Sequence, residues 1–191
     1  VAALQGNKQL TRKELYAALE RAGIQTASRG LHIITYWAQE GLLCFGPHQE
    51  KQPTFALLAE WAPHQRFLEG DEALKEIAQR YFISHGPATV QDFMWWTGLS
   101  AAEARTGLDL VKKQFVSQEQ AGKTYWFSPE LREIPSTSTL LLPCFDEYTV
   151  AYKDRSTAVA PEKLREYGYG INNNIVSNGI IIGEWKRTLQ K

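Results

Sequence analysis

The stretch HGPATVQDFMWWTGLSAAEARTGLDLV, residues 85–111, carries the most explicit local structural signals in the chain. Thr89 is expected to start a short helix that Gly98 ends, because glycine readily adopts the left-handed conformation found just after helices. Ser100 and Glu103 form a capping box, in which each side chain accepts a hydrogen bond from the other residue's backbone N–H. The following helix has apolar residues at helical spacing, namely Ala104, Leu108, Val111 and Phe115. The stretch therefore predicts two consecutive helices separated by a tight turn.

The residues on either side of this stretch complete a recognisable order of elements. Asp71 is expected to cap a preceding helix with a wide apolar stripe. That stripe consists of Leu74, Ile77, Ala78, Tyr81 and Phe82. After the later helix, residues 116–123 lead through Gly122 into the aromatic run 124–127, which predicts two strands joined by a loop. Helix, turn, helix and hairpin is the order of a winged helix, so we expect one at residues 71–135.

The amino-terminal part of the chain shows the same order. Thr11 and Glu14 form another capping box, which predicts a helix over residues 12–22. A second helical pattern ends at Gly41, and two short strand-like runs then flank the polar tip HQEKQ. We therefore expect a first winged helix at residues 1–70, and hence a tandem pair.

Beyond a predicted linker at residues 130–138, the period changes from helical to extended. Residues 139–142 and 148–152 read as strands, and Asn178-Gly179 between β-branched runs predicts a hairpin. Residues 136–191 are therefore expected to form a mostly β domain, and the expected fold class is α+β. Because the chain starts at Val1 and stops directly after a strand-like run, we also expect a fragment whose β domain is incomplete.

The composition excludes several classes of protein. The 21 basic and 21 acidic residues cancel, so any nucleic-acid hypothesis depends on where charges lie rather than on their sum. No run of about 18 apolar residues is present to span a membrane. The two cysteines form no framework, which favours a cytoplasmic protein. The four histidines lack metal-ligand spacing and no nucleotide-binding motif occurs, so neither a metal nor a cofactor is expected.

Several residues are candidates for chemistry, each with a plainer alternative. Asp146 and Asp154 would lie about 26 Å apart along an extended strand, which is too far for an acid–base pair. Pairing with neighbouring cations on an edge strand is therefore favoured over a functional role, although both readings stay open. His85 is expected to bind a carbonyl at a helix end rather than to act as a catalyst. The adjacent Trp95 and Trp96 are expected to lie in the core rather than to stack on bases.

DNA contact is the most specific functional hypothesis that the spacing supports, since winged helices place one helix in the major groove. Exposed polar residues on the expected recognition helices and on the second wing are Arg29, His32, Tyr36, Arg105, Lys112, Lys113 and Lys123. Asp109 lies between Arg105 and Lys112 and would weaken a phosphate contact. The alternatives are that these residues form solvated faces, or that the module binds another protein.

Five stretches carry a family resemblance: TRKEL (11–15), FGPHQEKQPTFALLAEW (45–61), RYFISHGPATVQDFMWWTGLS (80–100), LLPCFDEYTVAYKDRS (141–156) and NGIIIGEWKR (178–187). Together they resemble a bacterial winged-helix DNA-binding family that includes the DNA glycosylases which unhook azinomycin-type interstrand crosslinks. The resemblance implies tandem winged helices followed by a β-barrel-like domain. It also implies double-stranded, possibly damaged DNA as the partner, and removal of alkylated bases by hydrolysis of the N-glycosidic bond.

The resemblance also limits which residues can be given a role. In the glycosylase branch the catalytic motif is glutamine, an aliphatic residue, then glutamine or aspartate, in a winged helix upstream of this chain. Residues 4–7, LQGN, do not reproduce it, so no catalytic residue is expected here. Lys186 and Arg187 would lie near DNA, whereas Asp146 and Asp154 would fix loops or orient Arg155. A non-catalytic regulator and a protein-interaction module remain alternatives.

Overall fold

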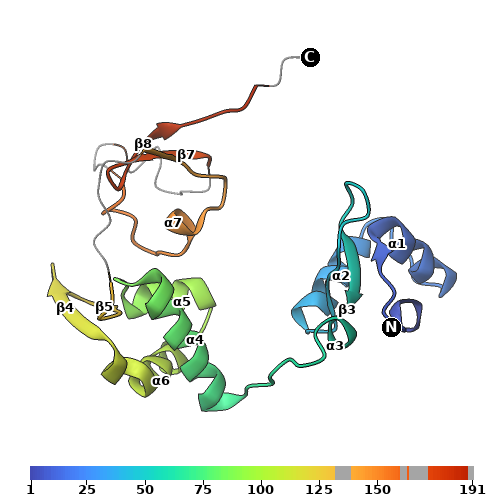
Figure 1. The fold of residues 1–191 in the computed structure, drawn as a ribbon, viewed down its shortest axis with the longest axis horizontal. Helices are drawn as coiled ribbons and strands as arrows, with labels where there is room; N and C mark the ends of the chain where they lie inside the picture. The colour runs from blue at the N-terminus through green and yellow to red at the C-terminus, as the bar shows by residue number, and fades with distance from the viewer. Residues whose placement is uncertain (132–138, 160–162, 164–171, 189–191) are drawn as a thin grey trace. The chain divides into compact units, whose positions relative to one another are not determined.

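The computed structural model describes residues 1–131, 139–159, 163 and 172–188. It divides into two compact units, Val1–Phe67 and Leu68–Lys191 (Figure 1). The described residues contain both helices and strands, which agrees with the predicted α+β class. Most of the predicted linker falls on residues 132–138, outside the described residues. The separation of 71–135 from 136–191 therefore stays a prediction.

The first unit combines short helices with a small sheet. Its elements are a 3-10 turn Ala2–Leu4, β1 Leu10–Thr11, α1 Arg12–Arg21, α2 Gly30–Gln39, β2 Leu43–Phe45, β3 Thr54–Leu57 and α3 Leu58–Trp61. The sheet is antiparallel in the order β1-β3-β2. The predicted capping box is confirmed, because Thr11 N donates to Glu14 Oε2 at 2.7 Å and Glu14 N donates to Thr11 Oγ1 at 3.4 Å.

The core of this unit is small, and it leaves much of α2 uncovered. The buried cluster consists of Leu4, Leu15, Ile34, Leu43, Phe55 and Leu57. On α2, Leu31, Tyr36 and Trp37 keep 52%, 54% and 44% of their surface exposed. No side chain caps the start of α2, whose N-cap residue is Arg29. This helix is held mainly through Ile34 and the close-packed Gly30.

The second unit begins with three packed helices and a two-stranded hairpin. These are α4 Gly70–His85, α5 Val90–Thr97, α6 Ala101–Val111, a 3-10 turn Lys112–Gln114, β4 Val116–Gln120 and β5 Lys123–Phe127. The Ser100–Glu103 capping box is confirmed, and Thr89 with Asp92 forms a second one. The prediction that Asp71 caps α4 is wrong, because the N-cap is Glu69. Asp71 lies inside the first turn, where a carboxylate still interacts favourably with the helix dipole.

The core of these helices is buried. It consists of Ala78, Tyr81, Phe82, Ala88, Phe93, Ala104, Leu108 and Val111. Ala88 also pairs with Trp126 of β5, which extends the hairpin by one bridge. Gly86 makes this approach possible, since a Cβ there would lie 2.6 Å from the Phe82 carbonyl oxygen and 2.8 Å from Phe127 Cα. The predicted apolar stripe of α4 thus meets the predicted stripe of α6.

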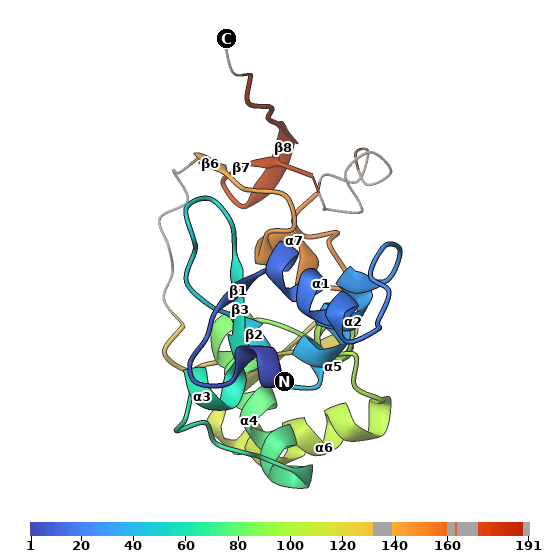
Figure 2. The ribbon, with the colours of Figure 1, turned by 90° about the vertical axis from the view of Figure 1, so that its right-hand side faces the viewer.

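The carboxy-terminal part contains β6 Thr139–Leu141, α7 Glu147–Val150, β7 Asn174–Ser177 and β8 Ile180–Glu184. The three strands form an antiparallel sheet in the order β6-β7-β8 and lie side by side in Figure 2. The Asn178-Gly179 hairpin is confirmed, with φ values of 52° and 77° that suit a two-residue turn. Among the described residues these three strands form an open sheet, and they do not close into the expected barrel.

One predicted strand is a helix. Residues 148–152 were expected to be extended, but α7 covers Glu147–Val150. The reason is local, because Asp146 Oδ1 accepts a hydrogen bond from Tyr148 N at 2.9 Å and thereby caps a helical turn. The expected 26 Å separation of Asp146 from Asp154 assumed an extended strand, so it does not apply.

Two further properties concern the whole described structure. No described helix is both long enough and apolar enough to cross a membrane. The described residues also contain no group of three or more histidine, cysteine or carboxylate side chains arranged to hold a metal ion.

Candidate nucleic-acid interface

Residues 145–156, here called the docked segment, contain α7 and lie against α4 and α5 of the same unit (Figure 1). Hydrogen bonds to backbone carbonyls hold it there. Tyr81 Oη donates to Ala151 O at 3.1 Å, and Trp95 Nε1 donates to Val150 O at 3.0 Å. In the opposite direction, Tyr152 Oη donates to the carbonyl of His85 at 2.8 Å. The conspicuous sequence FDEYTVAYKDRS is therefore first of all an anchored structural element.

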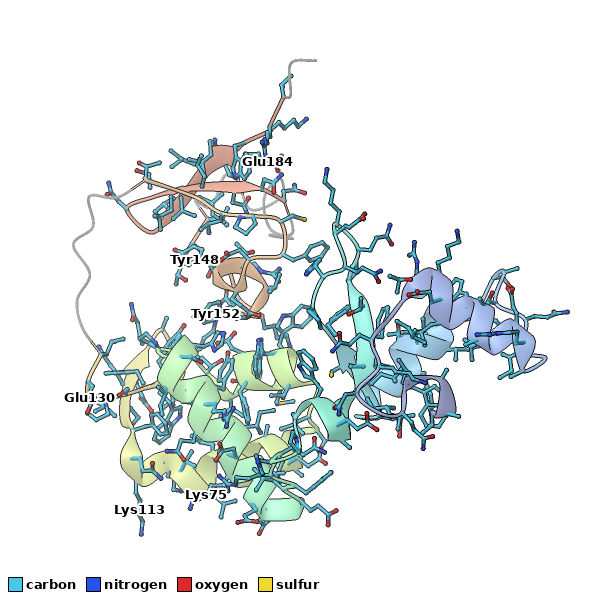
Figure 3. All side chains as sticks on the ribbon, turned by 45° about the vertical axis from the view of Figure 1, so that its right-hand side comes forward. Lys75, Lys113, Glu130, Tyr148, Tyr152 and Glu184 are labelled. Atoms are coloured by element: carbon cyan, nitrogen blue, oxygen red, sulfur yellow. The ribbon has the colours of Figure 1, made fainter. Side chains whose placement is uncertain are left out.

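Tyr148 and Tyr152 attach the docked segment on two sides (Figure 3). Tyr148 Oη donates to the carbonyl of Gly179 in the β7–β8 turn, while Tyr152 reaches the end of α4. Burial raises the pKa of Tyr152 to about 12 and also raises the pKa of Tyr81. Both phenols therefore keep the proton that they donate throughout the neutral range.

Asp92 joins the docked segment to the start of α5. It is only 4% exposed, and its Oδ2 accepts hydrogen bonds from Thr89 N at 2.9 Å and Thr89 Oγ1 at 2.7 Å. Its Oδ1 accepts from Lys153 N at 2.9 Å and from Asp154 N at 3.4 Å. One buried carboxylate thus caps a helix and fixes the backbone of two charged residues.

Two of the stretches that carry the resemblance, residues 80–100 and 141–156, meet at His85 and Glu147. His85 Nε2 lies 3.3 Å from Glu147 Oε2, and His85 Nδ1 lies 2.8 Å from Ser84 Oγ. Trp96 Nε1 donates to the same Glu147 oxygen at 3.0 Å, and the His85 ring stacks on Tyr81. The side chain of His85 therefore contacts a hydroxyl and a carboxylate rather than the expected carbonyl.

A cavity of about 1000 Å³ lies between the docked segment, α5, α6 and the β4–β5 hairpin. The basic residues that line it are Arg105, Lys123, Lys153 and Arg155. Its acidic residues are Asp92 and Asp154, both already engaged in hydrogen bonds. The structure thus brings four predicted site residues together here, namely Arg105, Lys123, Asp154 and Arg155.

Lys123 at the tip of the hairpin pairs with Asp154 of the docked segment. Asp154 Oδ1 also accepts from Ser156 N at 2.9 Å. The hydrogen bond from Lys123, followed by that from Ser156, lowers the pKa of Asp154 to about 2, and the same contact raises the pKa of Lys123. Asp154 is therefore a carboxylate held in its charged form, not a proton donor.

Arg155 contacts a main-chain carbonyl and an aromatic ring. Its Nε donates to the carbonyl of Thr149, and its guanidinium lies 5.8 Å from the centre of the Trp95 ring. Asp146, which was expected to fix a loop or to orient Arg155, instead caps α7.

The remaining predicted DNA-binding residues lie elsewhere. In the first unit, Arg29, His32 and Tyr36 are exposed at the start and along one side of α2. Lys112 is paired with Asp109 at 2.7 Å, as the proximity of the two residues suggested, whereas Lys113 is exposed (Figure 3). Lys186 and Arg187 are exposed directly after β8. Their role in DNA contact stays a prediction.

Sequence reasoning missed some of the important residues of this region. Trp95 and Trp96 are 53% and 38% exposed, so the prediction that they lie in the core is wrong; their indole N–H groups bind the docked segment. Asp92 had a detectable signal as the third residue after Thr89. Its bonds to residues 61 and 62 positions away had none.

The arrangement favours anion binding over acid–base chemistry. Both acidic residues of the cavity act as acceptors for nearby donors, and neither is paired with a second carboxylate in the manner of a glycoside hydrolase. Lysine and arginine side chains beside tyrosine hydroxyls are the groups that typically bind phosphate oxygens.

Comparisons with known proteins cover most or all of the chain. A family profile described as "DNA glycosylase AlkZ-like" matches residues 1–191. An "Interstrand DNA cross-link repair glycosylase" from Streptomyces sahachiroi is 27% identical over 164 residues, covering 78% of this chain and 44% of that protein. The structure of Streptomyces sahachiroi DNA glycosylase AlkZ superposes with a TM-score of 0.73 at 26% identity, covering 97% of this chain and 55% of that one. The chain spans about half the length of these relatives.

Proposed function

Because the chain belongs to the DNA glycosylase AlkZ-like family, we propose that it forms the DNA-holding part of a repair glycosylase that hydrolyses the N-glycosidic bond of alkylated bases. One observation carries the proposal beyond the family match. In the first unit α2 follows α1 and precedes the β2–β3 hairpin, and in the second unit α6 follows α5 and precedes the β4–β5 hairpin. Each of these helices carries an exposed basic residue, Arg29 at the start of α2 and Arg105 on α6.

The proposal includes a tandem winged-helix architecture. In the second unit, three helices, the Ala88–Trp126 bridge and the β4–β5 hairpin occur in winged-helix order. In the first unit, α1, α2 and the β1-β3-β2 sheet follow the same order. In such folds the later helix enters the major groove and the wing contacts phosphates. The helices α2 and α6 are therefore the proposed recognition helices, and the β4–β5 hairpin is a proposed wing.

The chemistry is proposed to lie outside these 191 residues. No glutamine here is followed by an aliphatic residue and then by glutamine or aspartate. The relatives are about twice as long as the matched chain, which leaves room for the motif elsewhere. A bacterial, cytoplasmic repair protein that needs neither a metal nor a cofactor fits this proposal.

Excision of N7-alkylguanine from duplex DNA tests the enzymatic part. A form of the protein that includes the sequence encoded upstream of Val1 is expected to release the base, whereas residues 1–191 alone are expected to bind DNA without excision. Excision by residues 1–191 would contradict the placement of the chemistry. Binding without excision by the longer form would favour a non-catalytic regulator.

Salt-dependent duplex binding tests the DNA-holding part. Replacing Lys186 and Arg187 by alanine is expected to weaken binding and to reduce the salt slope by about two, since each lost phosphate contact removes about one. Lys75→Ala on α4, an exposed lysine outside the proposed recognition helices and wing, serves as the control for loss of positive charge. An absence of duplex binding by the wild-type chain would favour a protein-interaction module, for which the exposed aromatic residues of α2 offer a surface.

A further inference from the structure

The cavity between the docked segment and the β4–β5 hairpin is lined by residues from four separate stretches of the second unit. Many of these residues remain exposed, including Gln91, Arg105, Lys123 and Lys153. A site for a small ligand usually encloses most of its occupant. An open, partly exposed cavity of about 1000 Å³ is instead suited to a polymer that passes along it.

The charges of the cavity favour an anionic polymer. Four basic side chains line it against two carboxylates, and the carboxylate of Asp92 is buried and fully used by Thr89 and the backbone of residues 153–154. Among the described residues, neither Arg105 nor Lys153 forms an ion pair. Tyr125 adds a phenol group to the lining, whereas the hydroxyls of Tyr148 and Tyr152 already donate to main-chain carbonyls. This is the chemistry that recognises a sugar-phosphate backbone.

We propose that this cavity holds the phosphate backbone of DNA. Without DNA, Asp154 pairs with Lys123; when DNA binds, a phosphate replaces Asp154 as the partner of Lys123. This inference rests on the proposed function and adds to it a specific site, with Lys153 as a further phosphate ligand. A carboxylate and a phosphate compete for the same ammonium group. Asp154 lies on the docked segment and Lys123 on the hairpin, so their ion pair joins two separate elements that both line the cavity.

The buried carboxylate of Asp92 positions the competing groups. Asp92 accepts hydrogen bonds from Lys153 N and Asp154 N, and so it fixes the backbone of both residues. Lys153 is a proposed phosphate ligand, whereas Asp154 masks another ligand, Lys123. The masking pair lowers affinity for DNA of any sequence. Binding is therefore favoured when several cavity residues contact phosphates together, and disfavoured when Lys123 is the sole phosphate contact.

Asp154→Asn tests the proposal, because asparagine keeps the acceptor for Ser156 N while removing the charge that holds Lys123. Duplex affinity is expected to rise about three- to tenfold at moderate salt, and the salt slope to steepen by about one. The matched control is Glu76→Gln, which removes the same charge from the Arg80 pair on α4, outside both the cavity and the proposed recognition helices. It is expected to change affinity much less. Equal gains from both variants would indicate a general charge effect and overturn the proposal.

A second variant keeps the test decisive if Asp154→Asn disturbs the docked segment. Replacing Arg105 and Lys153 by glutamine leaves the Asp92 network in place and is expected to lower affinity and to reduce the salt slope by about two. Near-ultraviolet circular dichroism checks that the fold is retained. If the wild type binds duplex DNA and this variant binds it equally well, the cavity site is refuted while the proposed function is not. No duplex binding by the wild type would refute the proposed function, and this inference with it.

Discussion

The two units share an order of elements but differ in how that order is stabilised. In the first unit, one capping box and a small apolar cluster hold α1 and α2, and Leu31, Tyr36 and Trp37 stay exposed. In the second unit, two capping boxes, a fully buried aromatic core and the docked segment all support the same helices. Helix order alone therefore does not determine how the helices are supported. Because long-range polar contacts reach α4 and α5, we expect the second unit to be the more stable one.

The largest expected effect comes from the aromatic core of the second unit. Phe82→Ala removes a fully buried ring that packs on Tyr81, Phe93 and Phe115, and it is expected to lower the free energy of unfolding by about 3–5 kcal/mol. The matched change Phe55→Ala in the first unit should cost less, about 3 kcal/mol, since that ring packs on the exposed Phe45. Chemical denaturation measures both. Equal losses would remove the proposed difference between the units.

The next effect comes from the buried carboxylate that has no counterpart among the described residues of the first unit. Asp92→Asn leaves backbone N–H donors without a charged acceptor and is expected to cost about 2–3 kcal/mol. Glu14→Gln changes the equivalent position of the exposed capping box in α1 and should cost clearly less. Hydrogen exchange at Lys153 and Asp154 should accelerate in the Asp92 variant. Unchanged exchange there would contradict the role of Asp92 in holding the docked segment.

A smaller effect is expected for the helix caps alone. Thr11→Ala should lower the free energy of unfolding by about 1 kcal/mol, because the side-chain acceptor at the start of α1 is lost. Thr89→Ala should cost more, since it also removes a donor to the buried Asp92. Thermal unfolding of the two variants gives the comparison. A larger loss for Thr11→Ala would reverse the proposed ranking of the units.

The smallest effect concerns the Lys123–Asp154 pair on the exposed edge of the second unit. Because the pKa of Asp154 is lowered to about 2 in the folded protein, the pair contributes stability above about pH 4, and this contribution is lost as the pH falls through about 2. The difference in melting temperature between wild type and Asp154→Asn should therefore shrink on acidification. A carboxyl resonance of Asp154 that titrates near 4 would show that the pair does not persist in solution.

The sequence was sufficient where the structure is determined by neighbouring residues. The capping boxes at Thr11 and Ser100 and the Asn178-Gly179 turn are local, and each was predicted correctly. The apolar stripe of α4 was likewise visible as a period, and its residues Ala78, Tyr81 and Phe82 are buried.

The sequence was insufficient where a distant partner decides. Thr149 and Val150 have β-branched side chains that favour strands, yet capping by Asp146 and the anchors from α4 and α5 stabilise a helix there. Trp95 and Trp96 looked like core residues because nothing local revealed that their N–H groups bind the docked segment. The charged residues of the cavity lie at positions 92, 105, 123 and 153–155, so only the fold brings them together.

The anchoring of the docked segment has a consequence for its tolerance to sequence change. Tyr81, Trp95 and Arg155 all donate to main-chain carbonyls, which every amino acid provides. The anchors therefore constrain the path of the segment far more than its exposed side chains. In a library that randomises Lys153, most variants should retain the wild-type backbone path. Charge at that position can then be varied over the same scaffold, as in an interchangeable recognition loop.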